Sequence, residues 1–81
     1  MKPVTDRNAK FADLIRRVRE RAGLNQYELA ARVGKPQSYI SKIERSERKL
    51  NLIDLEDIAR ALQSDPITLL TPLYYPKSKG S

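Results

Sequence analysis

The chain has 81 residues, which is enough for one small domain with a modest hydrophobic core. It contains neither Cys nor His, so a disulfide framework is excluded and the commonest ligands of transition metals are missing. The formal net charge of +6 favours a polyanionic partner such as nucleic acid, although a basic surface is by itself weak evidence.

The first predicted element is a helix over about residues 6–22, after a flexible N-terminus of residues 1–5. Apolar residues recur there at helical spacing, and Thr5 or Asp6 could cap the start. Gly23 is a suitable stop. The inward stripe of this helix consists of Phe11, Leu14, Ile15 and Val18.

Two short helices are predicted next, at residues 26–33 and 37–44, separated by a turn that contains Gly34. Asn25 and Glu28 have the spacing of a capping box at the start of the first. Helices this short are not stable alone in water, so they must pack on each other and on the rest of the chain. A short turn with Gly between two such helices indicates a helix-turn-helix, whose second helix can enter the DNA major groove.

A fourth helix is predicted from Leu52 to about Leu62, with Asn51 and Asp54 as a second capping box. A fifth helix should begin at Asp65-Pro66, be limited by Pro72, and be followed by a disordered tail at residues 76–81. No segment has the pattern of a strand. The predicted apolar stripe of the fourth helix consists of Leu52, Leu55, Ile58, Ala59 and Leu62. The fifth helix contains Ile67, Leu69 and Leu70.

The segment 26–45 resembles the helix-turn-helix of the Cro/cI-type (XRE) repressor family, and the resemblance extends from about Phe11 to Leu70. It implies an all-α, five-helix bundle of the lambda-repressor-like DNA-binding type over residues 6–75. It also implies a bacterial, phage or plasmid origin. The residues that match at fixed spacing are Gln26, Leu29, Ala30, Val33, Gly34, Gln37, Ser38, Ile40 and Ile43, followed by Glu44-Arg45.

Four residues of the second helix of this motif are predicted to read DNA bases. In the family, the first turn of this helix presents side chains to base edges, which places Gln37 and Ser38 there. Gln can bond adenine through N6 and N7, and Ser can donate or accept. Ser41 and Lys42 lie one turn further along, and Lys42 could reach guanine or a phosphate.

Contacts to the DNA backbone are predicted at five further residues. In the family, the Gln at the position of Gln26 contacts the DNA backbone, at a helix N-terminus that attracts phosphate. Here Glu28 would oppose a phosphate unless it turns back into the capping box. Tyr39 is either a phosphate or sugar contact or a half-buried aromatic. The remaining candidates, which could also be ordinary solvated charges, are Arg45, Arg48 and Lys49.

The resemblance also implies a structural ion pair between Arg19 and Glu44, partly buried, that orients the second helix of the motif against the scaffold. The sequence departs from the family at two positions. Lys35 replaces a usual aliphatic residue, and its methylene stem could cover the same surface. Ser46 replaces a usual Gly and would be strained by about 1 kcal/mol if its φ is positive.

The leading hypothesis is a transcriptional regulator, most simply a repressor, that binds double-stranded DNA as a homodimer on a two-fold symmetric site. The alternative is a protein-interaction module of the same fold, which would be an antitoxin, an antirepressor or a partner of the transcription machinery. The expected dimer surface, which could instead close the monomer core, consists of Ile67, Leu70, Leu73, Tyr74 and Tyr75.

We expect neither an enzyme nor a cofactor, because no catalytic constellation or phosphate-binding Gly loop is visible. No carboxylates cluster at the spacing of a metal-binding loop. No apolar run approaches the length of a transmembrane helix and no signal peptide opens the chain, which predicts a cytoplasmic protein that does not bind membranes.

Overall fold

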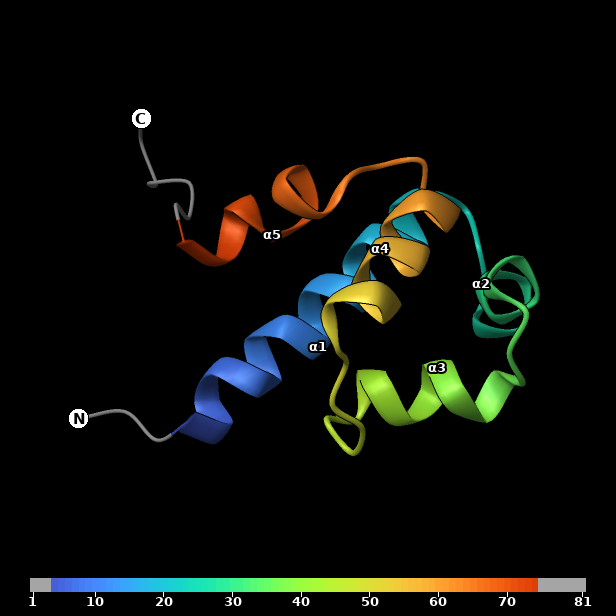
Figure 1. Ribbon diagram of the computed structural model, residues 1–81. Helices are drawn as coiled ribbons and strands as arrows, with labels where there is room; N and C mark the ends of the chain where they lie inside the picture. Colours follow the sequence, from blue (N-terminus) through green and yellow to red (C-terminus); the bar gives the residue numbers. More distant parts are fainter. Residues whose placement is uncertain (1–3, 75–81) are drawn as a thin grey trace.

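The computed structural model describes the backbone of residues 4–74 and the side chains of residues 7–73. Within that range the chain forms helices only, in the order α1 (Val4–Arg21), α2 (Gln26–Val33), α3 (Gln37–Glu44), α4 (Leu52–Ala61) and α5 (Pro66–Tyr74). α2 packs on α3 and α4, α1 packs on α3 and α5, and α4 packs on α5. Figure 1 shows α3 along one edge of the bundle, with the other helices on one side of it. The predicted all-α, five-helix fold is confirmed.

The core lies where α1, α2, α3 and α4 converge. Its fully buried large side chains are Ile15, Leu29, Ile40, Ile43 and Ile58. Each was identified in the sequence as an apolar position of its helix or of the matching motif, and each such side chain contributes about 1.5–3 kcal/mol when it leaves water. Because α2 and α3 each have only eight residues, this shared core is what makes them stable.

The helix ends follow the local chemistry of the sequence. Both capping boxes are present: Asn25 and Glu28 close the start of α2, and Asn51 and Asp54 close the start of α4. Gly34 ends α2 with a φ of 71°, and its N–H donates to the carbonyls of the last turn. The turn between α2 and α3 therefore has the geometry that the sequence predicted.

α1 begins earlier than predicted and α5 ends later. α1 starts at Val4, so Thr5 and Asp6 lie inside the helix and are not its caps. α5 continues through Pro72 to Tyr74. Proline lacks the N–H that would bond Thr68 O, but Pro72 lies in the last turn, so only one helix bond is lost there. The predicted disordered tail at residues 76–81 lies outside the described residues.

The predicted apolar stripe of α4 is wrong at its first residue. Leu55, Ile58, Ala59 and Leu62 are buried, whereas 66% of the surface of Leu52 is exposed. Leu52 is the first residue of α4 and lines an open cleft, together with Phe11, Leu50, Leu70 and Leu73. None of the helices within residues 4–74 is both long enough and apolar enough to cross a membrane.

Candidate DNA-binding face

The outer face of α3 is polar and open to solvent. Ser38, Lys42 and Arg45 are exposed and follow one another at intervals of four and three residues, so they form one stripe along the helix. Gln37, at the first position of α3, is half-buried beside this stripe. α3 lies at the edge of the domain (Figure 1). A helix with a free polar face in such a place can enter a major groove.

Ser41 does not belong to this exposed stripe, although it was predicted to read bases. It is 9% exposed, and its hydroxyl accepts a hydrogen bond from the guanidinium of Arg45. Ser41 lies one residue after Ile40 and two before Ile43, on the flank that turns toward the core. In this conformation Ser41 supports the Arg45 side chain, and its hydroxyl is not presented to solvent.

Arg19 and Glu44 form a buried ion pair between α1 and the end of α3. Arg19 Nε lies 2.6 Å from Glu44 Oε2, and Arg19 Nη2 lies 3.0 Å from Glu44 Oε1. Arg19 Nη1 also donates to the carbonyl of Leu24 at 2.8 Å. The two side chains are only 9% and 4% exposed, so the pair is more deeply buried than expected. The hydrogen bond with Glu44 raises the pKa of Arg19 further above its usual value.

Glu44 is connected to the start of α3 through two glutamine side chains. Gln26 Nε2 donates to Glu44 Oε1 at 2.9 Å, and Gln37 Nε2 donates to Gln26 Oε1 at 2.6 Å. The carboxylate can only accept, so Gln26 must present its N–H₂ to Glu44 and its oxygen to Gln37. The ion pair was predicted to be purely structural, but it also fixes the amide orientation of Gln37.

The fixed amide of Gln37 has a defined capacity for hydrogen bonding. One N–H of Nε2 is used by Gln26, which leaves the second N–H and the oxygen Oε1. Adenine presents the complementary pair in the major groove, because its N6 donates and its N7 accepts. Guanine presents two acceptors at the same place, so this amide suits adenine better.

Gln26 was predicted to contact the DNA backbone through its side chain, which in this structure is engaged with Glu44 and Gln37. The N-terminus of α2 itself stays available to an anion. Glu28 turns back into the capping box, where its carboxylate accepts from Asn25 N at 2.8 Å. A phosphate near this helix end would therefore meet backbone N–H groups beside a Glu carboxylate that is already hydrogen-bonded.

Tyr39 lies in the core, so its location agrees with the buried alternative for this residue. It is 8% exposed and belongs to the main cluster of apolar side chains. Burial raises the pKa of Tyr39, the charge of Asp54 raises it further, and a hydrogen bond with Arg48 lowers it. The phenol therefore stays protonated near neutral pH.

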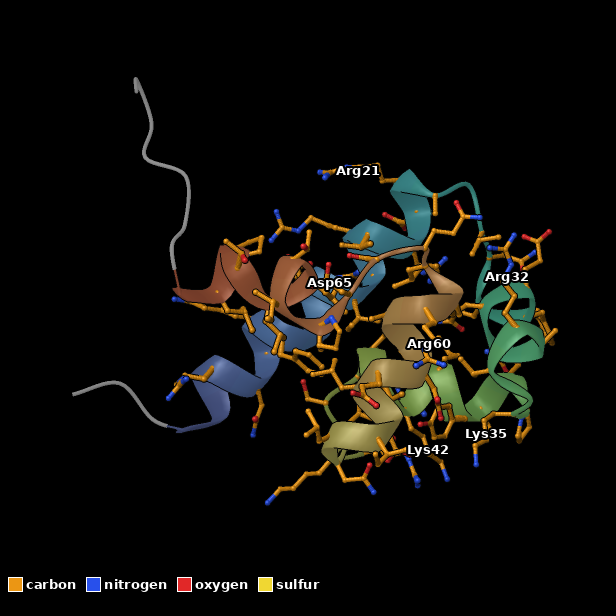
Figure 2. All side chains as sticks on the ribbon, turned by 45° about the horizontal axis from the view of Figure 1, so that its top comes forward. Arg21, Arg32, Lys35, Lys42, Arg60 and Asp65 are labelled. Carbon is orange, nitrogen blue, oxygen red and sulfur yellow. The ribbon has the colours of Figure 1, made fainter. Side chains whose placement is uncertain are left out.

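Exposed cations surround α3. Residues 35–49 contain five Lys or Arg and two Glu. Glu44 is occupied by Arg19, and the carboxylate of Glu47 pairs with Arg45 through two contacts of 3.1 Å. Figure 2 shows Lys35 and Lys42 at the edge formed by α3, whereas Arg21 lies at the opposite edge. The exposed cations on this side are Lys35, Lys42, Arg45, Arg48 and Lys49.

The residues expected to form a dimer surface differ in how exposed they are. Ile67 is 81% exposed, the highest exposure among the large apolar side chains described. Leu70 and Leu73 are half-buried and line the cleft between α1, α5 and the loop before α4. Leu69 closes the core instead. The side chain of Tyr74 and all of Tyr75 lie outside the described residues.

A helix-turn-helix family model matches residues 15–69, which contain the whole of α2, α3 and α4. The chain belongs to the XRE-type helix-turn-helix family of DNA-binding transcriptional regulators. It is 41% identical over 56 residues to an uncharacterized HTH-type transcriptional regulator, y4dJ, of Sinorhizobium fredii (strain NBRC 101917 / NGR234). That match covers 69% of this chain and 73% of the relative.

Two solved structures illustrate the likeness of this XRE-type chain in three dimensions. An XRE-family like protein from Pseudomonas syringae pv. tomato is 40% identical, with a TM-score of 0.80, over 91% of this chain and 90% of that one. The restriction-modification controller protein C.Esp1396I, solved as a tetramer with its natural 35 base-pair operator, is 29% identical with a TM-score of 0.76. That match covers 84% of this chain and 90% of the controller.

Sequence reasoning missed two features of this face. The contact between Gln26 and Gln37 was not predicted. Each is the first residue of its helix, but the two helix starts lie close together only because of the way α2 packs across α3. The contacts of Lys35 and Arg48 with Tyr39 were also missed. An aromatic residue flanked by cations in two adjoining loops was the available signal for these contacts.

Proposed function

We propose that this protein is a sequence-specific repressor that binds a two-fold symmetric operator as a homodimer, with α3 in the major groove. The observation that carries the proposal is the chain of hydrogen bonds from the buried Arg19–Glu44 pair through Gln26 to Gln37. A base-reading amide held by a buried charge is oriented before DNA arrives, which lowers the cost of ordering it on binding.

The proposed residue roles follow the exposed chemistry of α3. Gln37, Ser38 and Lys42 read base edges, and the exposed cations Arg45, Arg48 and Lys49 bind phosphates. The N-terminus of α2, at Gln26, is a further phosphate site. The Ser41 hydroxyl accepts a hydrogen bond from Arg45, and in this proposal Ser41 contacts no base.

A homodimer is proposed because one helix reads only a few base pairs. The proposed contact surface is the outer side of α5, centred on Ile67, with Leu70 and Leu73 at its edge. The operator-bound controller protein, which assembles as a tetramer, supports multimeric binding by analogy. A dimer on a promoter prevents access of polymerase without any further contact, which favours repression. The proposed site of action is the bacterial cytoplasm, on the nucleoid.

Selection of bound fragments from a random pool of duplex DNA tests this function. We expect enriched sequences with dyad symmetry, whose half-sites are about 34 Å or roughly ten base pairs apart. One position in each half-site should be adenine, where Gln37 binds. Enrichment of no sequence at all would contradict DNA recognition and favour a protein-interaction module, and enriched sites without symmetry would contradict the dimer.

A further inference from the structure

The ring of Tyr39 gathers two cations that come from opposite ends of α3. Lys35 Nζ lies 5.5 Å from the ring centroid, and Arg48 Cζ lies 4.7 Å from it. Lys35 is in the turn before α3, and Arg48 is in the loop after it. Both distances are within the range of a cation–π interaction.

Tyr39 is a rigid support for these two cations. Its ring is 8% exposed and packed in the core, so the surrounding side chains fix its orientation. Lys35 and Arg48 are exposed, and long exposed side chains lose much rotamer freedom when a ligand orders them. A contact with a fixed ring restricts them before any ligand binds.

The surroundings of the ring also explain Lys35, which replaces the aliphatic residue usual at this family position. An aliphatic side chain would contribute only apolar surface, whereas Lys35 adds a charge beside the ring face. Burial raises the pKa of Tyr39, and the carboxylates of Asp54 and Asp57 in α4 raise it further. The neutral phenol therefore keeps a π face without a negative charge that phosphate would avoid.

We propose that Tyr39 is a positioning residue that holds Lys35 and Arg48 ready for the phosphates on both sides of α3, and that it makes no DNA contact of its own. This inference rests on the proposed function. It replaces the expectation that the Tyr39 hydroxyl contacts a phosphate or sugar. It predicts that the aromatic ring matters more for DNA affinity than the hydroxyl, whose bond to Arg48 only adds to the contact with the ring.

Two substitutions separate the ring from the hydroxyl. Tyr39→Phe keeps the ring, and Tyr39→Leu keeps an apolar side chain without a π face. Dissociation constants for the selected operator and for random duplex DNA are measured by fluorescence anisotropy at several salt concentrations. We expect Tyr39→Phe to bind within about twofold of wild type, and Tyr39→Leu to bind both DNAs about 3- to 10-fold more weakly.

A double-mutant cycle distinguishes positioning from a general loss of structure. In a Lys35→Ala/Arg48→Ala background, Tyr39→Leu should cause no further loss of DNA affinity, because the side chains that it positions are gone. A purely structural effect of Tyr39→Leu would persist in that background. Circular dichroism melting identifies any variant that is not folded, and Tyr39→Met replaces Tyr39→Leu in the cycle if the latter fails to fold.

Three results would overturn the inference. They are a loss for Tyr39→Phe as large as that for Tyr39→Leu, unchanged binding by Tyr39→Leu, and a full effect of Tyr39→Leu without the two cations. The first would show that the hydroxyl, through its bond to Arg48 or through DNA, carries the effect and that the ring does not. Wild-type protein in the same titrations separates the two proposals, because equal affinity for operator and random DNA would refute the proposed function independently of Tyr39.

Discussion

Ser46 follows α3 with a φ of 61°, in the left-handed region that favours glycine. The sequence showed only that Ser stands where the family usually has Gly. The positive φ of Ser46 in the structure is the reason why a residue other than Gly is strained there. The Ser46 hydroxyl donates to the carbonyl of Asn8 over 3.4 Å, a weak exposed contact that offsets little of this strain.

Ser46→Gly should therefore stabilise the protein, by a few tenths to about 1 kcal/mol. Thermal or urea unfolding measures the change. Ser64→Gly is the matched control, because Ser64 is not among the residues with positive φ. It should gain no stability, and an equal gain for both variants would mean that relief of strain is not the cause.

Glu44 supports both the fold and the reading of bases. Glu44→Ala removes the partner of a buried guanidinium and should cost about 3 kcal/mol or more of unfolding free energy. It also frees Gln26, and with it the amide orientation of Gln37. Chemical denaturation checks the stability, and a midpoint equal to that of wild type would refute the role of the buried pair.

At the level of the helices, local signals in the sequence predicted most of the structure. The bounds of α2 and α3 were predicted correctly because Asn25, Gly34 and Pro36 act within one turn of the helix ends. The end of α5 was predicted wrongly because a proline in a last turn removes only one bond. The exposure of Leu52 was missed because helical spacing places this residue on the apolar stripe, whereas the structure places it beside an open cleft at the first position of α4.

Asp65 caps α5, since its carboxylate accepts from the N–H of Thr68 at 2.8 Å and from the Thr68 hydroxyl at 2.9 Å. Both hydrogen bonds lower the pKa of Asp65 below its ordinary value of 3.8, and the bond from the Thr68 backbone N–H has the larger effect. A lowered folded-state pKa means that this stabilisation is present above pH 3.8 and is lost as the pH falls through the folded pKa.

The comparison of wild type with Asp65→Asn tests this cap. Asn also caps helices but does not titrate. Wild type should melt at a higher temperature than Asp65→Asn near pH 6, and the difference should shrink below about pH 3.8. A difference in melting temperature that stays constant from pH 6 to pH 2 would show that the Asp65 charge does not support α5.

For the whole molecule, the exposed Ile67 predicts that two copies of the chain associate through α5. Ile67→Glu should weaken dimerisation and operator binding while leaving the melting temperature of the monomer nearly unchanged, because this side chain is 81% exposed. Analytical ultracentrifugation measures the dimer. Leu69→Ala is the contrasting variant, since it removes a core side chain and should lower the melting temperature.

Much less of the candidate site than of the fold could be predicted from the sequence. The family motif indicated α3, its exposed residues Ser38 and Lys42 and its half-buried Gln37, because the spacing of the motif fixes their positions on the helix. The burial of Ser41 and Tyr39 and the coupling of Gln26 to Glu44 depend on how α1, α2 and α3 cross. Those contacts join residues that are distant in sequence, so they required the structure.

The central claim is that Gln37 reads a base while the cations around α3 bind the phosphates of the DNA backbone. One pair of titrations tests it most directly. Gln37→Ala and Arg48→Ala are compared on selected operator and on random DNA over a range of salt concentrations. Arg48→Ala should weaken both DNAs about equally and lower the magnitude of the salt slope by about 1 per protomer. Gln37→Ala should lose about 1–3 kcal/mol per half-site on the operator alone, with an unchanged salt slope. Equal losses on operator and random DNA for Gln37→Ala would contradict the claim.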